Sequence, residues 1–413
     1  METKKLVVLG FGARGKIYAG FAEKYPEKFN LVAVIENDKV RLEDAKKLHP
    51  GAKLFSDYHD FLAANIKADV VAICTQDKDH KEHAISMMAA GYDLLLEKPI
   101  ANNKKDCIAI YKASQKYARK VIVCHVLRYS SFYSKIKELI DSGALGEVVT
   151  IHASENVGYF HQAHSFVRGP WRNKEQSSPM ILAKCCHDMD IIRYLMGEPC
   201  VSVNSYGDLL FFNREHAPKD SAEFCSECKV KDCVYRAQDV YLSLAGSDNG
   251  FLNYFLSGKE PTPENILSNL KRSQYDRCVF KCDNDVVDHE VTIMNFNGNK
   301  TACHTMTAFS RSIYRDIKVF GTKAELTGIM ENNKITVNYF GGKSEEIQLD
   351  VSGADVGMHN GSDFFMMNAL YKDLNGERAK GITYLDVSIE SHLMSFAAEE
   401  SRLHNGKTVK IKR

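Results

Sequence analysis

Short apolar runs alternate with helical patterns in the first third of the chain. The apolar runs are rich in valine, isoleucine and leucine and lack strict alternation, which is typical of strands buried on both faces. They occupy residues 6–9, 31–35, 70–74, 94–96 and 121–124. Between them lie stretches in which apolar residues recur with the period of an α-helix, at about residues 14–24, 39–48, 80–90 and 103–118. This order of strands and helices predicts a parallel, doubly wound sheet.

Beyond about residue 125 the pattern changes to longer runs in which apolar and polar residues alternate. Most of the predicted strands follow one another without helices between them. This arrangement favours an α+β domain on an open, mostly antiparallel sheet. The segment 212–285 has little periodicity, and we expect it to be rich in loops. The predicted strands lie at 148–154, 201–210, 290–296, 301–309, 316–320 and 334–339. The predicted helices lie at about 131–142, 178–196, 361–375 and 385–404.

Length and composition agree with two globular domains. A chain of 413 residues is too long for one simple core, and its 44% hydrophobic and 26% charged residues are ordinary for a globular protein. The change of pattern places the boundary between residues 1–124 and 125–413. The first part is expected to be an α/β domain with a Rossmann-type sheet, and the second the α+β domain.

The charge balance gives no reason to expect nucleic acid or a membrane as a partner. The formal net charge is +1, and no apolar run approaches the roughly 20 residues that cross a bilayer. Residues 1–5 lead directly into a strand and leave no room for a signal peptide, so we expect a cytoplasmic protein. In that compartment the twelve cysteines are expected to stay reduced.

A glycine-rich turn follows the first predicted strand and opens a helix. It reads Gly10-Phe11-Gly12-Ala13-Arg14-Gly15, which matches the dinucleotide-binding pattern in the context that this pattern requires. Gly10 permits the tight turn, Gly12 lets the backbone approach a pyrophosphate, and Gly15 allows close packing of helix on strand. The phosphates would bind at the helix N-terminus, where N–H groups and the helix dipole favour anions.

Glu36 ends the second predicted strand, about 20 residues after the glycine turn, where an acidic side chain can bind the adenosine ribose hydroxyls. A carboxylate there repels a 2′-phosphate, so NAD is favoured as the cofactor over NADP. Arg14 and Arg41 offer positive charge that would counter this preference, which keeps NADP possible. The alternative reading of Glu36 is a solvated side chain at a strand end.

Two further motifs follow buried strands and resemble one enzyme family. Residues 74–80 read Cys-Thr-Gln-Asp-Lys-Asp-His, and residues 91–100 read Gly-Tyr-Asp-Leu-Leu-Leu-Glu-Lys-Pro-Ile. The Glu-Lys-Pro triplet resembles the hallmark of the Gfo/Idh/MocA family, the glucose–fructose oxidoreductase and inositol dehydrogenase family. The resemblance extends over essentially the whole chain, through His125, Arg128, Tyr129, the segment 178–190 and the motif at 357–363.

This resemblance implies a fold, a reaction and an assembly. Family members have a Rossmann domain followed by an open, mostly antiparallel sheet domain, with the active site in the crevice between them. They oxidise a hydroxyl group of a sugar or cyclitol with a nicotinamide cofactor, or reduce the corresponding ketone. Homodimers or homotetramers that form through the C-terminal sheet are common in the family.

Lys98 is the first candidate for catalysis. It follows a parallel strand at its carboxyl end, the edge where doubly wound sheets bind ligands. A lysine ordinarily carries a positive charge at neutral pH, which suits it to polarise the reacting oxygen. Glu97 is expected to pair with Lys98 or to bind the cofactor near the nicotinamide. The alternative for Lys98 is an ordinary surface lysine after a strand.

The predicted helix at 180–195 places Lys184, His187 and Asp188 on one face. His187 titrates near neutral pH and is the natural proton acceptor. In the family an aspartate often precedes this histidine by four residues, but here that position is Ala183, followed by Lys184. Lys184 is therefore either a second cation or the proton acceptor itself, unless it forms an ion pair with Asp188 on a solvated face.

Further residues are candidates for binding. Thr75 and His80 are expected to line or support the cofactor pocket, and His125 and Arg128 to reach substrate or nicotinamide. The segment 155–173 is dense in polar and aromatic residues, so its tryptophan suits stacking on a sugar, although a plain structured loop is the alternative. The predicted substrate ligands are His125, Arg128, Trp171, Asp188 and His359, with Asp363 as a further partner for substrate hydroxyls.

A cysteine cluster in the loop-rich segment is a candidate metal site. Cys225, Cys228 and Cys233 form a Cys-x2-Cys pair with a third cysteine close by. Three thiolates suit a structural zinc ion, with a fourth ligand from Cys278, Cys282 or His216. Half of the usual double pair is missing, so thiols without a metal are the alternative.

Three functions fit these patterns. The first is an NAD(P)-dependent dehydrogenase of a sugar, glycoside or cyclitol. The second is redox-assisted cleavage of a glycoside, in which the bound cofactor is oxidised and reduced within one turnover. The third is a sensor on the same fold that is gated by a nucleotide and does not catalyse. The lysine of the triplet and the helix histidine are both present, which favours an enzyme.

Overall fold

The computed structural model describes residues 1–246, 256, 260–271, 273–350, 361–379 and 381–412. Its first sheet has six strands in the order β3-β2-β1-β4-β5-β6, all parallel, which is the doubly wound order of dinucleotide-binding domains. The strands are β1 (Lys4–Leu9), β2 (Phe29–Ile35), β3 (Lys53–Phe55), β4 (Val70–Ile73), β5 (Asp93–Leu96) and β6 (Val121–Val123).

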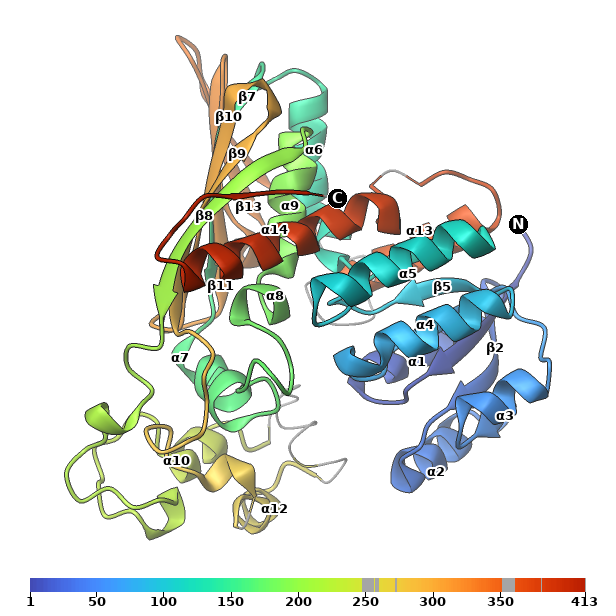
Figure 1. Cartoon of the computed structure of the whole chain (residues 1–413), viewed down its shortest axis with the longest axis horizontal. Helices are drawn as coiled ribbons and strands as arrows, with labels where there is room; N and C mark the ends of the chain where they lie inside the picture. Colours follow the sequence, from blue (N-terminus) through green and yellow to red (C-terminus); the bar gives the residue numbers. More distant parts are fainter. Residues whose placement is uncertain (247–255, 257–259, 272, 351–360, 380, 413) are drawn as a thin grey trace.

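Helices cover both faces of this sheet (Figure 1). Alternate residues of β1 belong to two separate cores, Leu6 and Val8 to one and Val7 and Leu9 to the other. Burial on both faces explains why the strands read as continuous apolar runs, and it confirms the predicted Rossmann sheet. The helices are α1 (Ala13–Lys24), α2 (Lys39–Leu48), α3 (Tyr58–Ala63), η1 (Asp77–Asp79), α4 (His80–Ala89) and α5 (Lys104–Tyr117).

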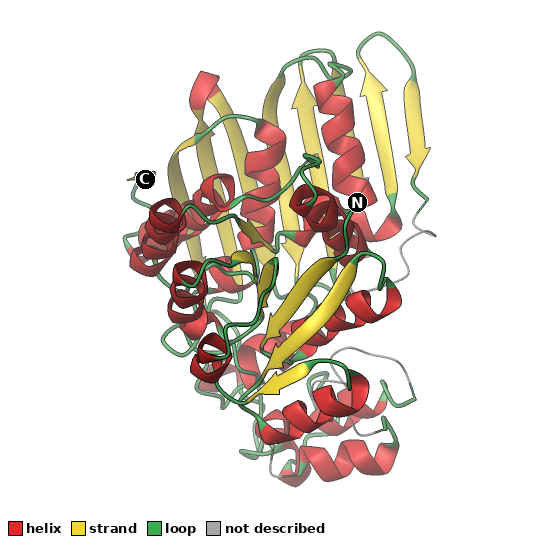
Figure 2. Ribbon diagram, turned by 90° about the vertical axis from the view of Figure 1, so that its right-hand side faces the viewer, coloured by secondary structure: helices red, strands yellow, loops and turns green. Residues whose placement is uncertain are grey.

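The second sheet has nine strands and runs β14-β13-β12-β11-β7-β10-β9-β8-β15. Strands β7 and β10 pair in parallel and the other neighbours are antiparallel, which confirms a mostly antiparallel sheet. Figure 2 shows it behind its covering helices. The strands are β7 (Val148–Asn156), β8 (Cys200–Asp208), β9 (His289–Phe296), β10 (Lys300–Thr307), β11 (Tyr314–Gly321), β12 (Ala324–Ile329), β13 (Lys334–Tyr339), β14 (Ser344–Gln348) and β15 (Val409–Lys410).

The long helices of the second sheet lie on one of its faces (Figure 1). The inward residues of β9 are buried while the outward ones are not, so that Ile293 is 54% exposed and Val291 42% exposed. Neighbouring strands add Val149 and Val201 to the exposed apolar residues. The helices that pack near this sheet are η2 (Val126–Tyr129), α6 (Ser131–Asp141), α8 (Met180–Ala183), α9 (Cys186–Met196) and α14 (Leu385–Leu403), with η7 (Asn297–Asn299) and η8 (Met330–Asn332) between strands.

The C-terminal part of the chain returns to the first sheet. Helix α13 (Ser362–Leu374) packs on α1, where the ring of Phe364 contacts Phe21. The N–H of Val123 in β6 donates to the carbonyl of Thr383, and the next residue, Tyr384, forms a bridge to β6. Helix α14 then packs against α5 and β8, so it contacts elements of both sheets.

The described part of the segment between β8 and β9 has few regular elements, as predicted for 212–285. Its described part has short helices around two small hydrophobic clusters, one of them centred on Tyr241 and the other on Phe212. The elements here and in the preceding loop are α7 (Tyr159–His161), the π-helical turn η3 (Gln162–Arg168), η4 (Arg214–His216), η5 (Cys225–Glu227), α10 (Ala237–Leu242), α12 (Pro263–Leu270) and η6 (Gln274–Asp276).

The structure corrects the sequence prediction in several places. Strands β3, β12, β14 and β15 and helix α3 were not predicted, because each has at most six residues, too few for a clear period to show. The single helix predicted at 180–195 is two helices, which break at Lys184 and Cys185.

All twelve cysteines are free thiols. Within the described residues no helix has both the length and the apolar character that crossing a membrane requires.

Candidate active site

The glycine turn after β1 has the geometry that its sequence predicts. Gly10 has φ +94°, and a Cβ atom there would lie 2.7 Å from the carbonyl oxygen of Cys74. A Cβ atom on Gly15 would lie 2.0 Å from the carbonyl oxygen of Gly10. Around Gly12 the closest atom to such a Cβ is a guanidinium nitrogen of Arg41 at 3.9 Å. The turn is therefore tight at both ends and open in the middle, at the N-terminus of α1, where a pyrophosphate fits.

Glu36 supports this turn. Its side chain is 5% exposed, and its oxygens accept hydrogen bonds from the N–H groups of Phe11 at 2.6 Å and Asp38 at 2.9 Å. The carboxylate is thus held beside the glycine turn and is not a solvated side chain. Each carboxylate oxygen has a second lone pair, so Glu36 can also accept a hydrogen bond from a hydroxyl group.

Arg14 lies in a buried ionic cluster. Its Nε donates to Oε1 of Glu97 at 2.6 Å, and its Nη2 donates to Oδ1 of Asp363 at 2.5 Å and to the hydroxyl of Tyr18 at 2.6 Å. Burial opposes the charge of Glu97, but Arg14 and Tyr18 outweigh this effect and lower the pKa of Glu97 below its usual value.

This cluster bears on three sequence predictions. Arg14 binds two carboxylates, which balance its charge, so the structure gives no support for Arg14 as a partner of a 2′-phosphate. Glu97 pairs with Arg14 and not with the amine of Lys98. Asp363, 1% exposed, binds Arg14, which argues against the contact with substrate hydroxyls that its motif suggests. His359 lies outside the described residues.

Lys98 joins the two halves of the molecule. Its Nζ donates to the carbonyl oxygen of Ala183 at 3.2 Å, and the Lys98–Pro99 peptide bond is cis. After this bond, the N–H of Ile100 donates to Nε2 of His392 on α14 at 2.9 Å. The amine therefore stands at the carboxyl end of β5, between the first sheet and the segment that carries His187.

His80 and Thr75 hold the loops at the same edge of the sheet. His80 is fully buried, with Nδ1 2.9 Å from the carbonyl oxygen of Pro99 and Nε2 3.2 Å from that of Thr75. The hydroxyl of Thr75 lies 3.0 Å from Nδ1 of His83. Both nitrogens of His80 contact backbone, so its role is to connect the loops after β4 and β5, in keeping with support of the cofactor pocket.

The break between α8 and α9 directs Lys184 into a buried ionic network. Its Nζ lies 3.1 Å from Oε1 of Glu155, which is fully buried on β7. Arg315 on β11 binds the same carboxylate and also Asp188, whose Oδ1 lies 2.9 Å from its Nε. The predicted alternative, a Lys184–Asp188 pair on a solvated face, is wrong, because each residue has another partner in the interior.

His187 is the second residue of α9 and is 5% exposed. Its ring lies 5.9 Å from the ring of His125, which in turn lies 5.5 Å from that of His392. Burial, together with the charges of Arg128 and Lys98, lowers the pKa of His125 well below its usual value. Burial likewise lowers the pKa of His392 to about 3. Both neighbours are therefore neutral at physiological pH.

Arg128 and Trp171 are placed differently from their predicted roles. Arg128 is 4% exposed, and its Nε and Nη2 each donate to Asp190 at 2.6 Å. This bidentate pair fixes α9 against η2, which corrects the expectation that Arg128 reaches substrate or nicotinamide. Trp171 is half-buried near Phe166, 6.3 Å between ring centroids, and its stacking on a sugar stays a prediction.

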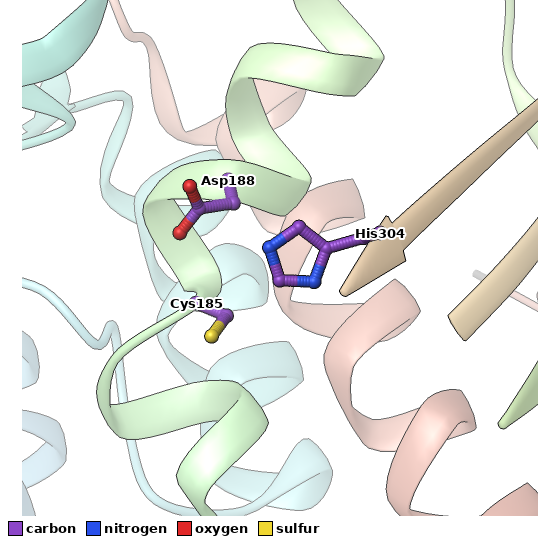
Figure 3. A group of neighbouring side chains, drawn as sticks. All are labelled: Cys185, Asp188 and His304. Atoms are coloured by element: carbon purple, nitrogen blue, oxygen red, sulfur yellow. The ribbon is translucent and has the colours of Figure 1, made fainter. Parts of the chain in front are cut away.

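One cluster of possible metal ligands near His187 escaped the sequence analysis. The ligand atoms of Cys185, Asp188 and His304 lie within 4.8 Å of one another (Figure 3). Burial raises the pKa of the Cys185 thiol well above its usual value, and Asp188 already binds Arg315. The carboxylate of Asp188 already has a cationic partner in Arg315, so the group does not favour a further cation. The sequence indicated this group only through His304, which occupies an inward position in the alternating pattern of β10.

Glu155, Arg315 and His392 are the other residues near the site whose roles the sequence did not indicate. Each lies in a strand or helix far along the chain from the residue that it contacts. The cysteines of the predicted zinc site lie elsewhere, in the segment between β8 and β9.

Comparison with known proteins agrees with this geometry. Residues 4–125 match the family described as "Oxidoreductase family, NAD-binding Rossmann fold", and residues 137–399 match its "C-terminal alpha/beta domain". The structure of a levoglucosan dehydrogenase in complex with NADH and levoglucosan is similar over 100% of both chains, with a TM-score of 0.73 and 16% identity.

Relatives are also found by sequence. An oxidoreductase of Bacillus subtilis named YteT is 23% identical over 336 residues, which cover 78% of this chain and 76% of the relative. An inositol 2-dehydrogenase of Pseudomonas savastanoi pv. phaseolicola is 29% identical over 205 residues, which cover 48% of this chain and 56% of the relative. The match to this second relative thus spans about half the length of either protein. The two family matches together cover most of the sequence, and the chain belongs to the Gfo/Idh/MocA family of NAD-binding oxidoreductases.

Proposed function

We propose that this protein is a dehydrogenase that transfers a hydride between a hydroxyl-bearing carbon of a sugar or cyclitol and NAD. The observation that carries the proposal is the contact of Lys98 Nζ with the carbonyl oxygen of Ala183, 3.2 Å across the two halves of the molecule. It brings a cationic donor from the cofactor-binding sheet beside the segment of His187. Relatives named for levoglucosan and inositol support a small polyhydroxylated substrate.

The glycine turn and Glu36 support NAD as the cofactor. The open middle of the turn and the N-terminus of α1 suit the pyrophosphate, and the buried carboxylate beside them suits ribose hydroxyls. Arg41 is the cation that stands near Gly12, so it replaces Arg14 as the residue on which any use of NADP would depend.

Substituting Glu36→Gln keeps an acceptor for the N–H of Phe11, and it is expected to reduce the preference for NAD over NADP.

The chemistry divides between two side chains. NAD held by the glycine turn and Glu36 would supply the acceptor for the hydride that leaves the carbinol carbon. The hydroxyl proton leaves to the imidazole of His187, and the ammonium group of Lys98 donates a hydrogen bond to the oxygen as negative charge develops on it. The oxygen then forms the carbonyl of the product.

Lys184 acts as a second cation in this proposal and not as the proton acceptor. Its Nζ lies 3.1 Å from Oε1 of Glu155, which is fully buried on β7, so the amine is already engaged by a carboxylate in the interior. The proton then passes to His187, whose neighbours His125 and His392 are neutral and do not repel the imidazolium.

The test uses Lys98→Met and His187→Ala, with Lys112→Met, an exposed lysine on α5, as the matched control. Each variant is mixed with NAD and a panel of sugars, cyclitols and glycosides, and NADH is followed by its absorbance. The two site variants are expected to lose turnover and still bind NAD in calorimetry, while Lys112→Met keeps both. Rates close to wild type in both site variants would overturn the assignment.

The same panel separates simple oxidation from cofactor recycling. Products are identified by mass spectrometry beside the absorbance reading. Oxidised product in equal amount to NADH supports the dehydrogenase. Cleaved glycoside without net NADH would instead show redox-assisted cleavage.

We also propose that the protein forms a homodimer or homotetramer through the second sheet. The face of this sheet opposite its long helices carries exposed Val149 on β7, Val291 and Ile293 on β9, and Val201 on β8 (Figure 1). An apolar patch of this kind is typical of an interface between subunits.

A further inference from the structure

Four cysteines meet in the segment between β8 and β9. Cys225 and Cys278 come together because two distant stretches of chain pair: Phe224 and Arg277 form a β-bridge, and the N–H of Cys278 donates to the carbonyl of Glu223 at 2.9 Å. These two cysteines line one small cavity together with Cys228 and Cys233.

The cavity has the size of an ion site. It has about 10 Å³ of space for the centre of a water-sized sphere, which is close to the room that one small bound species needs. The rest of its wall includes the apolar side chains of Val230, Val279 and Phe280. The sulfur atoms of the four cysteines are therefore the candidate metal ligands of this cavity.

Arg168 provides an independent observation. Its side chain is 1% exposed and lines the same cavity. The guanidinium donates to the carbonyl oxygens of Arg277 and Tyr235, each at 2.7 Å, and Nη2 lies 3.5 Å from Sγ of Cys225. Among the described residues, no carboxylate lies within ion-pair distance of it.

A buried cation without a counter-ion is costly, and buried charges are normally paired. Four neutral thiols would leave the charge of Arg168 uncompensated. Four thiolates around a divalent cation carry a net charge of −2, and Arg168 would then donate a hydrogen bond to the sulfur of Cys225 and offset part of this charge. The position of the arginine thus indicates an anionic cluster at the cysteines.

We propose that Cys225, Cys228, Cys233 and Cys278 bind one zinc ion. Four sulfur ligands with a Cys-x2-Cys pair are the typical set of a closed, tetrahedral structural site. No position would stay open for a substrate, so this ion holds the fold and does not take part in hydride transfer.

The structure selects the fourth ligand from the three candidates of the sequence. Neither Cys282 nor His216 lines the cavity; Sγ of Cys282 lies 3.3 Å from the carbonyl of Cys278, and Nδ1 of His216 lies 3.0 Å from Asn213. As they stand, no three of the four sulfurs lie within 4.8 Å of one another; among the described residues only the group at Cys185 meets that limit. Binding therefore draws the thiols inward.

The ion would also hold the loop after β7. Arg168 ends η3, and this turn begins directly after His161. A zinc site that fixes Arg168 would therefore also fix η3.

The test measures the metal itself. The full chain is purified under reducing conditions from zinc-supplemented medium, and its metals are measured by mass spectrometry. We expect one zinc per chain, and at least a fivefold lower content in Cys228→Ser and Cys278→Ser. Cys282→Ser and Cys303→Ser, which change cysteines outside the cavity, are expected to retain the ion.

A second measurement does not depend on the folding of the variants. In the wild-type chain, four thiols should resist alkylation until a chelator is added, and peptide mapping should identify them as the four cavity cysteines. Wild-type protein without zinc would overturn the proposal. So would iron in its place, a disulfide among these cysteines, or protection at a different set.

Discussion

Replacing Glu290 with glutamine is expected to make the protein more stable above neutral pH. Glu290 lies on β9 and is 1% exposed. Its Oε1 accepts a hydrogen bond from Ser205 at 2.8 Å, whereas its Oε2 has no hydrogen-bond partner among the described residues. The nearby cation Arg402 is engaged by Glu399 at 2.7 Å. Burial raises the pKa of Glu290 to about 7, and the hydrogen bond from Ser205 offsets this only in part.

The sign of the effect follows from proton binding. Between the unfolded pKa of 4.5 and the folded value of about 7, the folded protein binds more protons at Glu290 than the unfolded chain does. The free energy of unfolding therefore falls as the pH rises through this window, and the loss is complete above pH 7. At about 1.4 kcal/mol per pKa unit, the loss is on the order of 3 kcal/mol.

The assay compares urea unfolding of wild type and Glu290→Gln at pH 5, 6, 7 and 8. The amide keeps an acceptor for Ser205 and cannot ionise, so the variant should gain stability over wild type as the pH rises, by about 1–3 kcal/mol at pH 8. Glu400→Gln, an exposed position on α14, is the control. A constant difference between Glu290→Gln and wild type across this range would refute the reasoning.

Three further changes test other parts of the structure. Gly15→Ala places a Cβ atom 2.0 Å from the carbonyl oxygen of Gly10, so NAD binding measured by calorimetry should weaken by at least tenfold. Arg315→Met leaves two buried carboxylates without their shared cation, which should lower the free energy of unfolding by about 3–5 kcal/mol in a denaturant titration. Ile293→Lys puts a charge in the exposed apolar face of the second sheet and should shift the assembly to monomers in analytical ultracentrifugation.

Each of these has a matched control in the same chain. Gly20→Ala changes a glycine of the same helix where no atom lies within 4 Å of the new Cβ, and it should bind NAD normally and gain about 0.5–1 kcal/mol of stability. Arg311→Met and Leu48→Lys change exposed residues and should behave as wild type. Equal effects in a variant and its control would contradict the structural reason given for it.

The fold was largely predictable because its strands have a clear physical signature. Strands buried on both faces are continuous apolar runs, whereas strands with one solvent-exposed face alternate apolar and polar residues. The change between these two patterns near residue 125 therefore separated the two sheets. Elements that are too short to show a period, such as β3, could not be recognised. The break at Lys184 was also hidden, because side chains on β7 and β11 hold that residue and its neighbours in place.

The residues of the candidate site could be proposed from the sequence, but their partners could not. Lys98, His187 and the glycine turn follow from motifs, whose spacing reflects local backbone geometry. Arg14 and Arg128 carry the right charge for a ligand, but each is bound by a carboxylate that lies far along the chain. Single positions in a sequence do not show which buried charges pair.

The partner of Lys184 bears directly on the proposed reaction, because Ala183 stands where the family often has an aspartate. Without a carboxylate at that position, an acceptor for the positive charge of Lys184 must come from elsewhere, and Glu155 supplies it at 3.1 Å from the interior of the second sheet. Arg315 then balances Glu155 and Asp188 together, which leaves the network close to neutral. Lys98 remains outside this network, with a backbone carbonyl as its described partner. In the proposed reaction its charge would therefore be available to a developing oxyanion, and His187 would be left as the group that takes the proton.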